Sequence, residues 1–154
     1  MRKILVIGVA VAAALALAGV AWAQNGHFIH SQTCTDIGTQ VRCTGTVAGL
    51  GSTKTFRVTV TANGVATVEC KNKGGNVAPG QSFSFTTSGT TGNQPVPANG
   101  STDYTVTTQQ PSAPAGSCPN GGWTATVTDV TFTSATLTLF EGNTQSDQVT
   151  VPVN

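Results

Sequence analysis

Small polar residues, mostly threonine, alternate with valine and aromatic residues along much of this chain. The clearest case places Phe56, Val58 and Val60 on one side of residues 55–61, with threonines and an arginine on the other. Successive side chains of a β-strand point to opposite faces, so this period of two predicts a strand with one buried face. Shorter alternating stretches recur at residues 41–47, 66–70, 83–86, 104–107, 123–127, 130–132, 137–139 and 149–153. Eight or nine short strands are therefore expected.

The composition agrees with strands and argues against helices. Residues 24–154 contain 27 threonines and 14 valines but only 3 leucines and no methionine. Branching at Cβ restricts a side chain in a helix and favours a pleated surface. We expect an all-β fold, an immunoglobulin-like antiparallel β-sandwich of about seven to nine strands with two disulfides. An up-and-down barrel is the alternative.

Two local signals concern where strands turn or slip. Asn63-Gly64 predicts a tight hairpin, because a type I′ turn needs positive φ at both central residues. The apolar positions change phase at Thr128-Asp129, which predicts a β-bulge or a change of strand partner. The proline-rich residues 109–116 are expected to form a long loop between strands, because only 38 residues follow them.

The first 23 residues have the pattern of a secretory signal peptide. Two basic residues precede an uncharged run from Ile4 to Ala23, which ends in Ala21-Trp22-Ala23. Residues 24–154 are then one secreted β-sandwich domain, extracellular or, if the source has an outer membrane, periplasmic. This domain has 5 basic and 6 acidic side chains, a formal charge of −1. That balance argues against nucleic-acid binding, and no later apolar run is long enough for a membrane span.

Cys34, Cys43, Cys70 and Cys118 predict two disulfides in an oxidising compartment. Three pairings are possible, and we favour Cys34–Cys43 across a hairpin and Cys70–Cys118 between two strands. In the chain-entropy model their loops of 10 and 49 residues correspond to about 2.7 and 4 kcal/mol. A zinc site is the rival interpretation, but the chain has no Cys-x-x-Cys pair.

Three stretches carry a resemblance to known proteins. They are residues 43–51, residues 70–81 with the pattern Cys-x-Asn-x-Gly-Gly-Asn, and Cys118–Trp123 leading to Val130–Phe132. Together they resemble a group of uncharacterised small secreted bacterial proteins, often actinobacterial, with a single β-sandwich domain. The resemblance implies a fold and a secreted location but no reaction, so it assigns no catalytic or binding residue.

Residues that could carry catalysis are few and scattered. His27 and His30 lie close to the expected mature N-terminus, and Ser88 lies in a threonine-rich turn without a Gly-x-Ser-x-Gly motif. The carboxylates never occur as close pairs or as an acidic calcium loop. They are Asp36, Glu69, Asp103, Asp129, Glu141 and Asp147. We therefore expect no enzyme, no catalytic residue, no metal and no cofactor.

Two narrower hypotheses have simpler alternatives. Removal of Gln24 would leave Asn25-Gly26-His27, a sequence suited to square-planar Cu(II) or Ni(II), whereas the simpler interpretation is a solvated tail. Trp123 and Tyr104 are candidates for a sugar-stacking platform. Both are in phase with apolar neighbours, so we expect them in the core.

The sequence therefore predicts a secreted, non-enzymatic structural or binding module of the cell surface or medium. Its expected partner is cell-wall polysaccharide or another extracellular protein. Sandwiches often bind through loops, and the candidate loops are residues 49–52, 71–81 and 109–122. The candidate binding residues are Lys71, Asn72, Lys73 and Asn76. The alternative is a secreted hydrolase or protease inhibitor that acts through a disulfide-pinned loop, with Lys71 and Lys73 as its contact residues.

Overall fold

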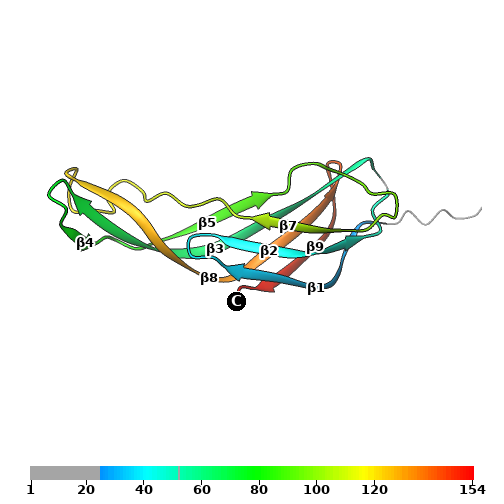
Figure 1. Cartoon of the computed structure of the whole chain (residues 1–154), viewed down its shortest axis with the longest axis horizontal. Coiled ribbons are helices and arrows are strands. Elements are labelled where there is room, and N and C mark those ends of the chain that lie inside the picture. The colour runs from blue at the N-terminus through cyan, green and yellow to red at the C-terminus, as the bar shows by residue number, and fades with distance from the viewer. Residues whose placement is uncertain (1–24, 52) are drawn as a thin grey trace, which may run out of the picture.

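The computed structural model of the chain describes residues 25–51 and 53–154, which form nine β-strands in two antiparallel sheets (Figure 1). The described residues contain no helix, so the expected all-β class is confirmed. The predicted signal peptide, residues 1–23, lies outside the described residues.

The smaller sheet has three strands in the order β1-β2-β7. These are β1 (His27–Asp36), β2 (Val41–Ala48) and β7 (Thr102–Thr107). The larger sheet has six strands in the order β4-β3-β8-β9, with β5 and β6 also paired to β3. Its strands are β3 (Thr55–Asn72), β4 (Val77–Pro79), β5 (Phe83–Thr90), β6 (Gln94–Pro95), β8 (Trp123–Glu141) and β9 (Thr144–Pro152).

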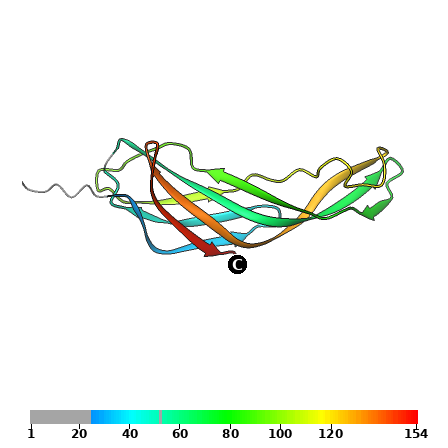
Figure 2. The same cartoon turned by 180° about the vertical axis from the view of Figure 1, so that it is seen from behind.

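The shape of the molecule follows from two long strands. β3 has 18 residues and β8 has 19, against 10, 8 and 6 in the smaller sheet. The turn between β1 and β2 reaches β8 at Val130, whose N–H donates to the Gly38 carbonyl. Beyond that point the larger sheet continues without the smaller one, so the molecule is elongated (Figures 1 and 2). We call this extension, residues 67–81 and 109–129, the arm.

The core lies between the two sheets and follows the alternation in the sequence. Every second residue of β3 from Phe56 to Cys70 is buried, including Gly64. Those from Phe56 to Ala66, apart from Gly64, belong to one hydrophobic cluster, which also contains Val41 and Val47 of β2, Val106 of β7 and Leu137 and Leu139 of β8. Because residues i and i+2 share a face, one uninterrupted pattern buries one side of an 18-residue strand.

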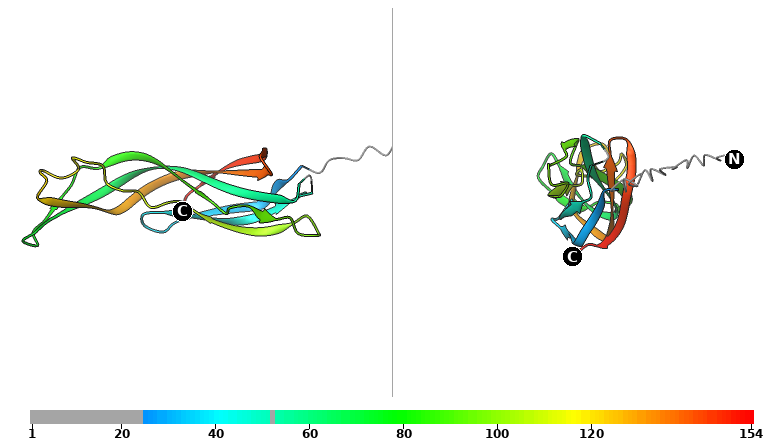
Figure 3. Two further views of the ribbon diagram at one scale, coloured as in Figure 1. Left: turned by 90° about the horizontal axis from the view of Figure 1, so that it is seen from above. Right: turned by 90° about the vertical axis from the view of Figure 1, so that its right-hand side faces the viewer.

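The sheets also touch at their edges. β1 meets the C-terminus, where Asn154 donates to the Cys34 carbonyl and its own carbonyl accepts from Asp36 N–H. Figure 3 shows β1 and β9 side by side in the end-on view. On the other side, Gln109 N–H donates to the Ser88 carbonyl, which links the end of β7 to β5. The two layers form a sandwich, and its immunoglobulin-like order stays a prediction.

The hairpin predicted at Asn63-Gly64 is wrong. β3 passes straight through both residues, and neither has a positive φ. A Cβ atom on Gly64 would lie 2.6 Å from Val130 Cγ1 and 2.9 Å from Phe132 Cε1. The glycine therefore gives space for β8 to pack beside β3, and continuous pairing of β3 with β8 and β5 outweighs the local turn preference.

The bulge predicted at Thr128-Asp129 is confirmed. Thr67 pairs with Asp129 and Val68 with Val127, so Thr128 is an additional residue in β8. A second irregularity sets Thr133 and Ser134 opposite Asn63. At each place two consecutive β8 residues are exposed, and this restores the inward phase of the next apolar residue.

Both predicted disulfides are present, Cys34–Cys43 and Cys70–Cys118. Cys34 and Cys43 are direct partners across the β1–β2 ladder. Cys70 lies near the end of β3, whereas Cys118 lies in the loop before β8. The first disulfide fastens a hairpin and the second fastens a long loop to the arm.

Candidate functional site

The end of the arm brings together two of the three predicted binding loops. The β3–β4 turn and the loop before β8 meet there, opposite the end where the described chain begins (Figures 1 and 3). Asn72 pairs with Trp123, and Lys71 pairs with Val77 on one side and Thr124 on the other. We call residues 70–81 and 116–124 the tip.

The Cys70–Cys118 disulfide is one of several contacts that hold the tip. Gly80 N–H donates to the Val68 carbonyl at 2.7 Å, and Gln81 N–H donates to the Ser117 carbonyl at 2.8 Å. A Cβ atom on Gly80 would lie 2.9 Å from Cys70 Sγ and 3.0 Å from the Ser117 carbonyl oxygen. The loop before β8 therefore packs directly against β3 and against the residues that follow β4.

The four predicted binding residues have different roles in this geometry. Lys71 and Asn72 are the last two residues of β3, so their placement in a loop is wrong. Lys71 is exposed on this strand, and Lys73 is exposed in the turn that follows. Asn72 shapes the turn, because its Oδ1 accepts from Asn76 N–H at 2.9 Å and its carbonyl accepts from Gly75 N–H. The positive φ of 82° at Gly75 suits glycine. Lys71, Lys73 and Asn76 are thus exposed, whereas the side chain of Asn72 supports the turn.

The charge of the tip differs from that of the rest of the molecule. Lys71 and Lys73 are its charged side chains, which gives a formal charge of +2. The other described residues contain three basic and six acidic side chains, a formal charge of −3. Lys71 shares a face with exposed Val77, its partner on β4. The tip therefore presents two cations, one of which lies beside an exposed valine.

The two aromatic candidates differ in their surroundings. Tyr104 is 6% exposed in the core, as expected, and burial raises the pKa of its hydroxyl. Trp123 is half-buried and in phase with Ala125 and Val127. The smaller sheet does not cover this part of β8; instead residues 110–113 of the proline-rich loop border Ala125 and Val127. Trp123 therefore belongs to the inner side of the tip.

Residues 49–51 of the third predicted loop, 49–52, lie at the opposite end and are held to the body. Ser52 lies outside the described residues. Leu50 is buried, and its N–H donates to the Gly100 carbonyl at 3.0 Å. Buried Glu141 accepts from Gly51 N–H through Oε1 and from Gly26 N–H through Oε2. The backbone of this segment is therefore hydrogen-bonded to the body, and the segment is not part of the tip.

The histidines are not in a solvated tail, since both belong to β1. His30 has a φ of 60° at an irregular part of the β1–β2 ladder. His27 Nδ1 lies 3.0 Å from the Asn25 carbonyl oxygen. A Cu(II) site at residues 25–27 would need the Gly26 amide nitrogen, and that N–H donates to Glu141 at 2.8 Å. Copper binding would therefore replace an existing buried contact.

The outer face of the larger sheet is rich in hydroxyl groups. Thr136 Oγ1 lies 3.1 Å from Thr150 Oγ1 on the neighbouring strand, and Thr86 Oγ1 donates to Asn63 Oδ1. Other exposed hydroxyl residues on these strands are Thr61, Thr67, Ser84, Ser88, Thr90, Thr124, Thr126, Thr131 and Thr133. Ser88 thus lies in a strand among similar residues, not in the turn expected for it.

No group of three or more His, Cys, Asp or Glu residues in the described chain has an arrangement that could hold a metal ion. The described part also lacks a helix of the length and hydropathy that a membrane crossing requires. No protein-family model matches the chain, and no curated protein matches it. The expectation that it is not an enzyme stays a prediction.

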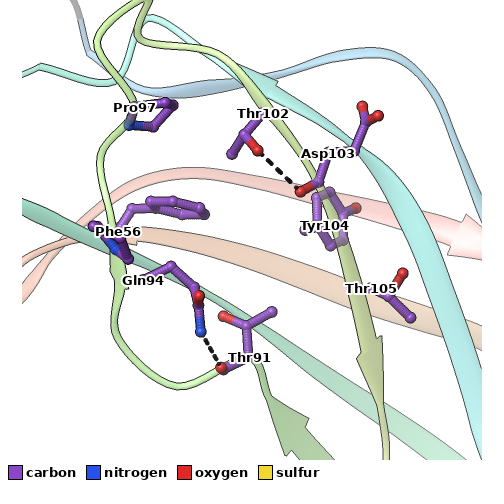
Figure 4. Close-up of a pocket in the computed structure, with 9 residues that line it drawn as sticks. Phe56, Thr91, Gln94, Pro97, Thr102, Asp103, Tyr104 and Thr105 are labelled. Atoms are coloured by element: carbon purple, nitrogen blue, oxygen red, sulfur yellow. Dashed lines mark hydrogen bonds between the residues drawn. The ribbon is translucent and has the colours of Figure 1, made fainter.

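One surface feature has no counterpart among the sequence predictions. A groove of about 430 Å³ lies between β7 and residues 91–97, with Phe56 and Tyr104 among its lining residues (Figure 4). The alternation correctly places both rings on inner faces. It carries no information on which inner faces meet at the rim of the sandwich, so the groove was missed.

Proposed function

We propose that this chain is a secreted, non-enzymatic binding module of the cell surface or extracellular medium. In this proposal the tip attaches to an anionic cell-wall polysaccharide. The body of the sandwich acts as a rigid support that holds the tip away from the rest of the molecule.

The observation that carries the proposal is the placement of Lys71 and Lys73 on a disulfide-held tip. Two flexible lysines alone make weak contacts, because ordering their side chains costs conformational entropy. A fixed backbone beneath them removes the additional entropic cost of ordering the loop on binding. The Cys70–Cys118 disulfide and the Ser117 contacts supply such a backbone.

Secretion fits the chemistry of the described residues. All four cysteines are paired, and paired cysteines are typical of oxidising compartments. The hydroxyl-rich face of the larger sheet adds a surface with few charges that suits contact with a hydrated polymer. These observations support an extracellular role together with the predicted signal peptide.

Co-sedimentation tests the proposal. The probe is insoluble peptidoglycan that either keeps or has lost its covalently attached anionic polymers. We expect the protein to pellet with the first preparation and at least fivefold less with the second. Bound protein should also fall as salt is added, because exposed charges are screened.

Matched lysine variants locate the contact. A double variant that carries Lys71→Ala and Lys73→Ala should lower the bound fraction of protein at least fivefold. Lys54→Ala, which removes an exposed lysine outside the tip, should leave it unchanged. Equal loss in both variants, or equal binding to both wall preparations, would contradict the proposal.

The inhibitor alternative rests on Lys73, which is exposed in the turn of the tip. Lys71 is a poor contact residue for a protease cleft, since it is paired with both β4 and β8. Inhibition of a trypsin-like protease that is lost in Lys73→Ala and kept in Lys71→Ala would favour this second function.

A further inference from the structure

The free edge of β7 lies beside a groove with an apolar lining. β7 ends the order β1-β2-β7 and, within the described chain, pairs only with β2. Thr102, Asp103, Tyr104 and Thr105 form one wall of the groove. Figure 4 shows Phe56 pointing into the space between this wall and the segment that contains Gln94 and Pro97.

The hydrogen-bond pattern shows which backbone groups face the groove. Thr108 N–H donates to the Val41 carbonyl, so residues 41 and 108 form a hydrogen-bonded pair. Such pairs alternate along an antiparallel ladder. The groups of Tyr104 therefore point to β2, and those of Asp103 and Thr105 point to the free edge. The Asp103 carbonyl accepts from Thr102 Oγ1 at 3.3 Å, which leaves a second lone pair available.

Both ends of this free edge are closed by the protein itself. Gly89 of β5 approaches so near that a Cβ atom on it would overlap the Thr107 carbonyl, and Gln109 N–H donates to Ser88. At the other end β7 begins at Thr102, directly after a turn in which Gly100 N–H donates to the Pro97 carbonyl at 2.9 Å. The open stretch is about four residues long, which at ~3.3 Å per residue fits a short extended peptide.

The opposite wall is already in place. Thr91 N–H donates to the Val58 carbonyl, and Val58 N–H donates to Thr91 Oγ1, both at 3.0 Å. Gln94 Nε2 donates to the Thr91 carbonyl at 2.9 Å. This braced segment flanks the β7 edge. A single extended chain enters such a space more readily than the edge of a second folded sheet, so we favour a peptide over a second copy.

The side chains around the groove define the chemistry of the peptide. A residue paired opposite Tyr104 points inward, toward Phe56 and Pro97, and should be apolar. A residue opposite Asp103 points outward beside that carboxylate. Asp103 is exposed, accepts from Thr46 Oγ1 at 2.6 Å, and forms no ion pair within the described chain. A lysine or arginine is therefore favoured at that position.

From these observations we propose that the β7 edge binds an extended peptide by antiparallel strand addition, with a basic residue opposite Asp103 and an apolar residue opposite Tyr104. The site is separate from the tip and does not depend on the polysaccharide proposal. It uses backbone groups that edge strands otherwise leave exposed to unwanted pairing.

The test uses capped hexapeptides and the purified protein with its disulfides intact. The first probe is Thr-Thr-Val-Lys-Thr-Thr, in which Val precedes Lys because an antiparallel peptide meets Tyr104 before Asp103. The second probe has Glu in place of Lys. We expect the Lys peptide to shift the amide resonances of Asp103 and Thr105 and to bind at least fivefold more tightly than the Glu peptide. Asp103→Lys should reverse this preference, whereas Asp129→Lys, a change at another exposed carboxylate, should not.

Backbone methylation of the peptide tests strand addition without altering the protein. Only alternate amides of an added strand face β7, so N-methylation of one alternate set should weaken binding at least fivefold more than methylation of the other. Equal effects of the two sets, absence of shifts at millimolar peptide, or the same shifts on raising protein concentration alone would overturn the proposal. The last result would assign the edge to a second copy.

Discussion

Gly45 of β2 shows how one missing side chain permits a buried polar cluster. A Cβ atom at this position would overlap Gln32 Oε1, which accepts from the Tyr104 hydroxyl at 2.7 Å. Gln32 Nε2 donates to the carbonyls of Ile29 and His30. The glycine therefore allows Gln32 to fill the irregular part of β1 and to satisfy backbone groups there.

We predict that Gly45→Ala destabilises the fold by about 2–4 kcal/mol, because it combines overpacking with loss of buried hydrogen bonds. Urea unfolding measures the effect. Gly121→Ala is the control: no atom lies within 4 Å of a Cβ atom there, and the change should stay within about 0.5 kcal/mol. Equal stability of the two variants would show that Gln32 moves without cost.

Tyr104 should make stability depend on alkaline pH. Burial raises the pKa of its hydroxyl above the ordinary value of 10.0, so the unfolded chain loses this proton first. The stabilisation is complete below pH 10 and is lost as pH rises above it. Because the chain has a single tyrosine, tyrosinate absorbance reports this group alone and should appear only with unfolding.

Tyr104→Phe should lower stability at neutral pH by about 1–2 kcal/mol, since Gln32 Oε1 loses its hydroxyl donor. Its further loss of stability above pH 10 should be smaller than that of the unmodified chain. Tyrosinate absorbance at pH 10 from a protein that is still folded would contradict the burial of Tyr104.

At the scale of elements, the sequence predicts faces better than connections. The alternation identifies the inward residues of β3 and β8 and the Thr128 bulge. The favoured disulfide pairs, which rest on a hairpin and on a link between two strands, are also confirmed. The sequence prediction fails at Asn63-Gly64, because the turn preference of two residues is weaker than pairing with β8 on one side and β5 on the other. Which strands continue and which turn depends on contacts distant in sequence, and alternation alone does not encode them.

For the candidate site, too, the sequence predicts the local features but not how they come together. Cys70, Cys118 and the lysines mark the tip, and the loops around it are recognisable from glycine and proline. Their meeting depends on β3 and β8 both continuing past the smaller sheet, which follows from the long register between them. A prediction of the β7 groove would require knowledge of which strand lies at the edge of its sheet, and the alternation does not give the strand order.

We predict that the two disulfides contribute differently. Replacing Cys70 and Cys118 by alanine should cost about 4 kcal/mol, and replacing Cys34 and Cys43 about 2.7 kcal/mol. The first change should also expose Trp123, because the loop before β8 loses its covalent link. Urea unfolding and the emission wavelength of Trp123 measure both effects. An unchanged emission without Cys70–Cys118 would show that the hydrogen bonds of Ser117 hold the loop alone.

At the level of the whole molecule, the arm places the two lysines of the tip apart from the two-sheet body. The body contains both sheets, and the arm carries the positively charged tip to one end (Figure 2). Hydroxyl groups cover much of the outer face of the larger sheet, so this face carries few charges. The proposed function therefore requires that the tip is the part of the molecule that contacts the polymer.

Resonance mapping of the protein with soluble fragments of the anionic wall polymer tests this most directly. We predict that the amide shifts concentrate in residues 71–77 and 117–123, with the tip residues losing their shifts as salt rises. Residues 27–62 should not move. Shifts confined to the outer face of the larger sheet, or to residues 49–51 at the opposite end, would contradict the assignment of the tip as the binding site.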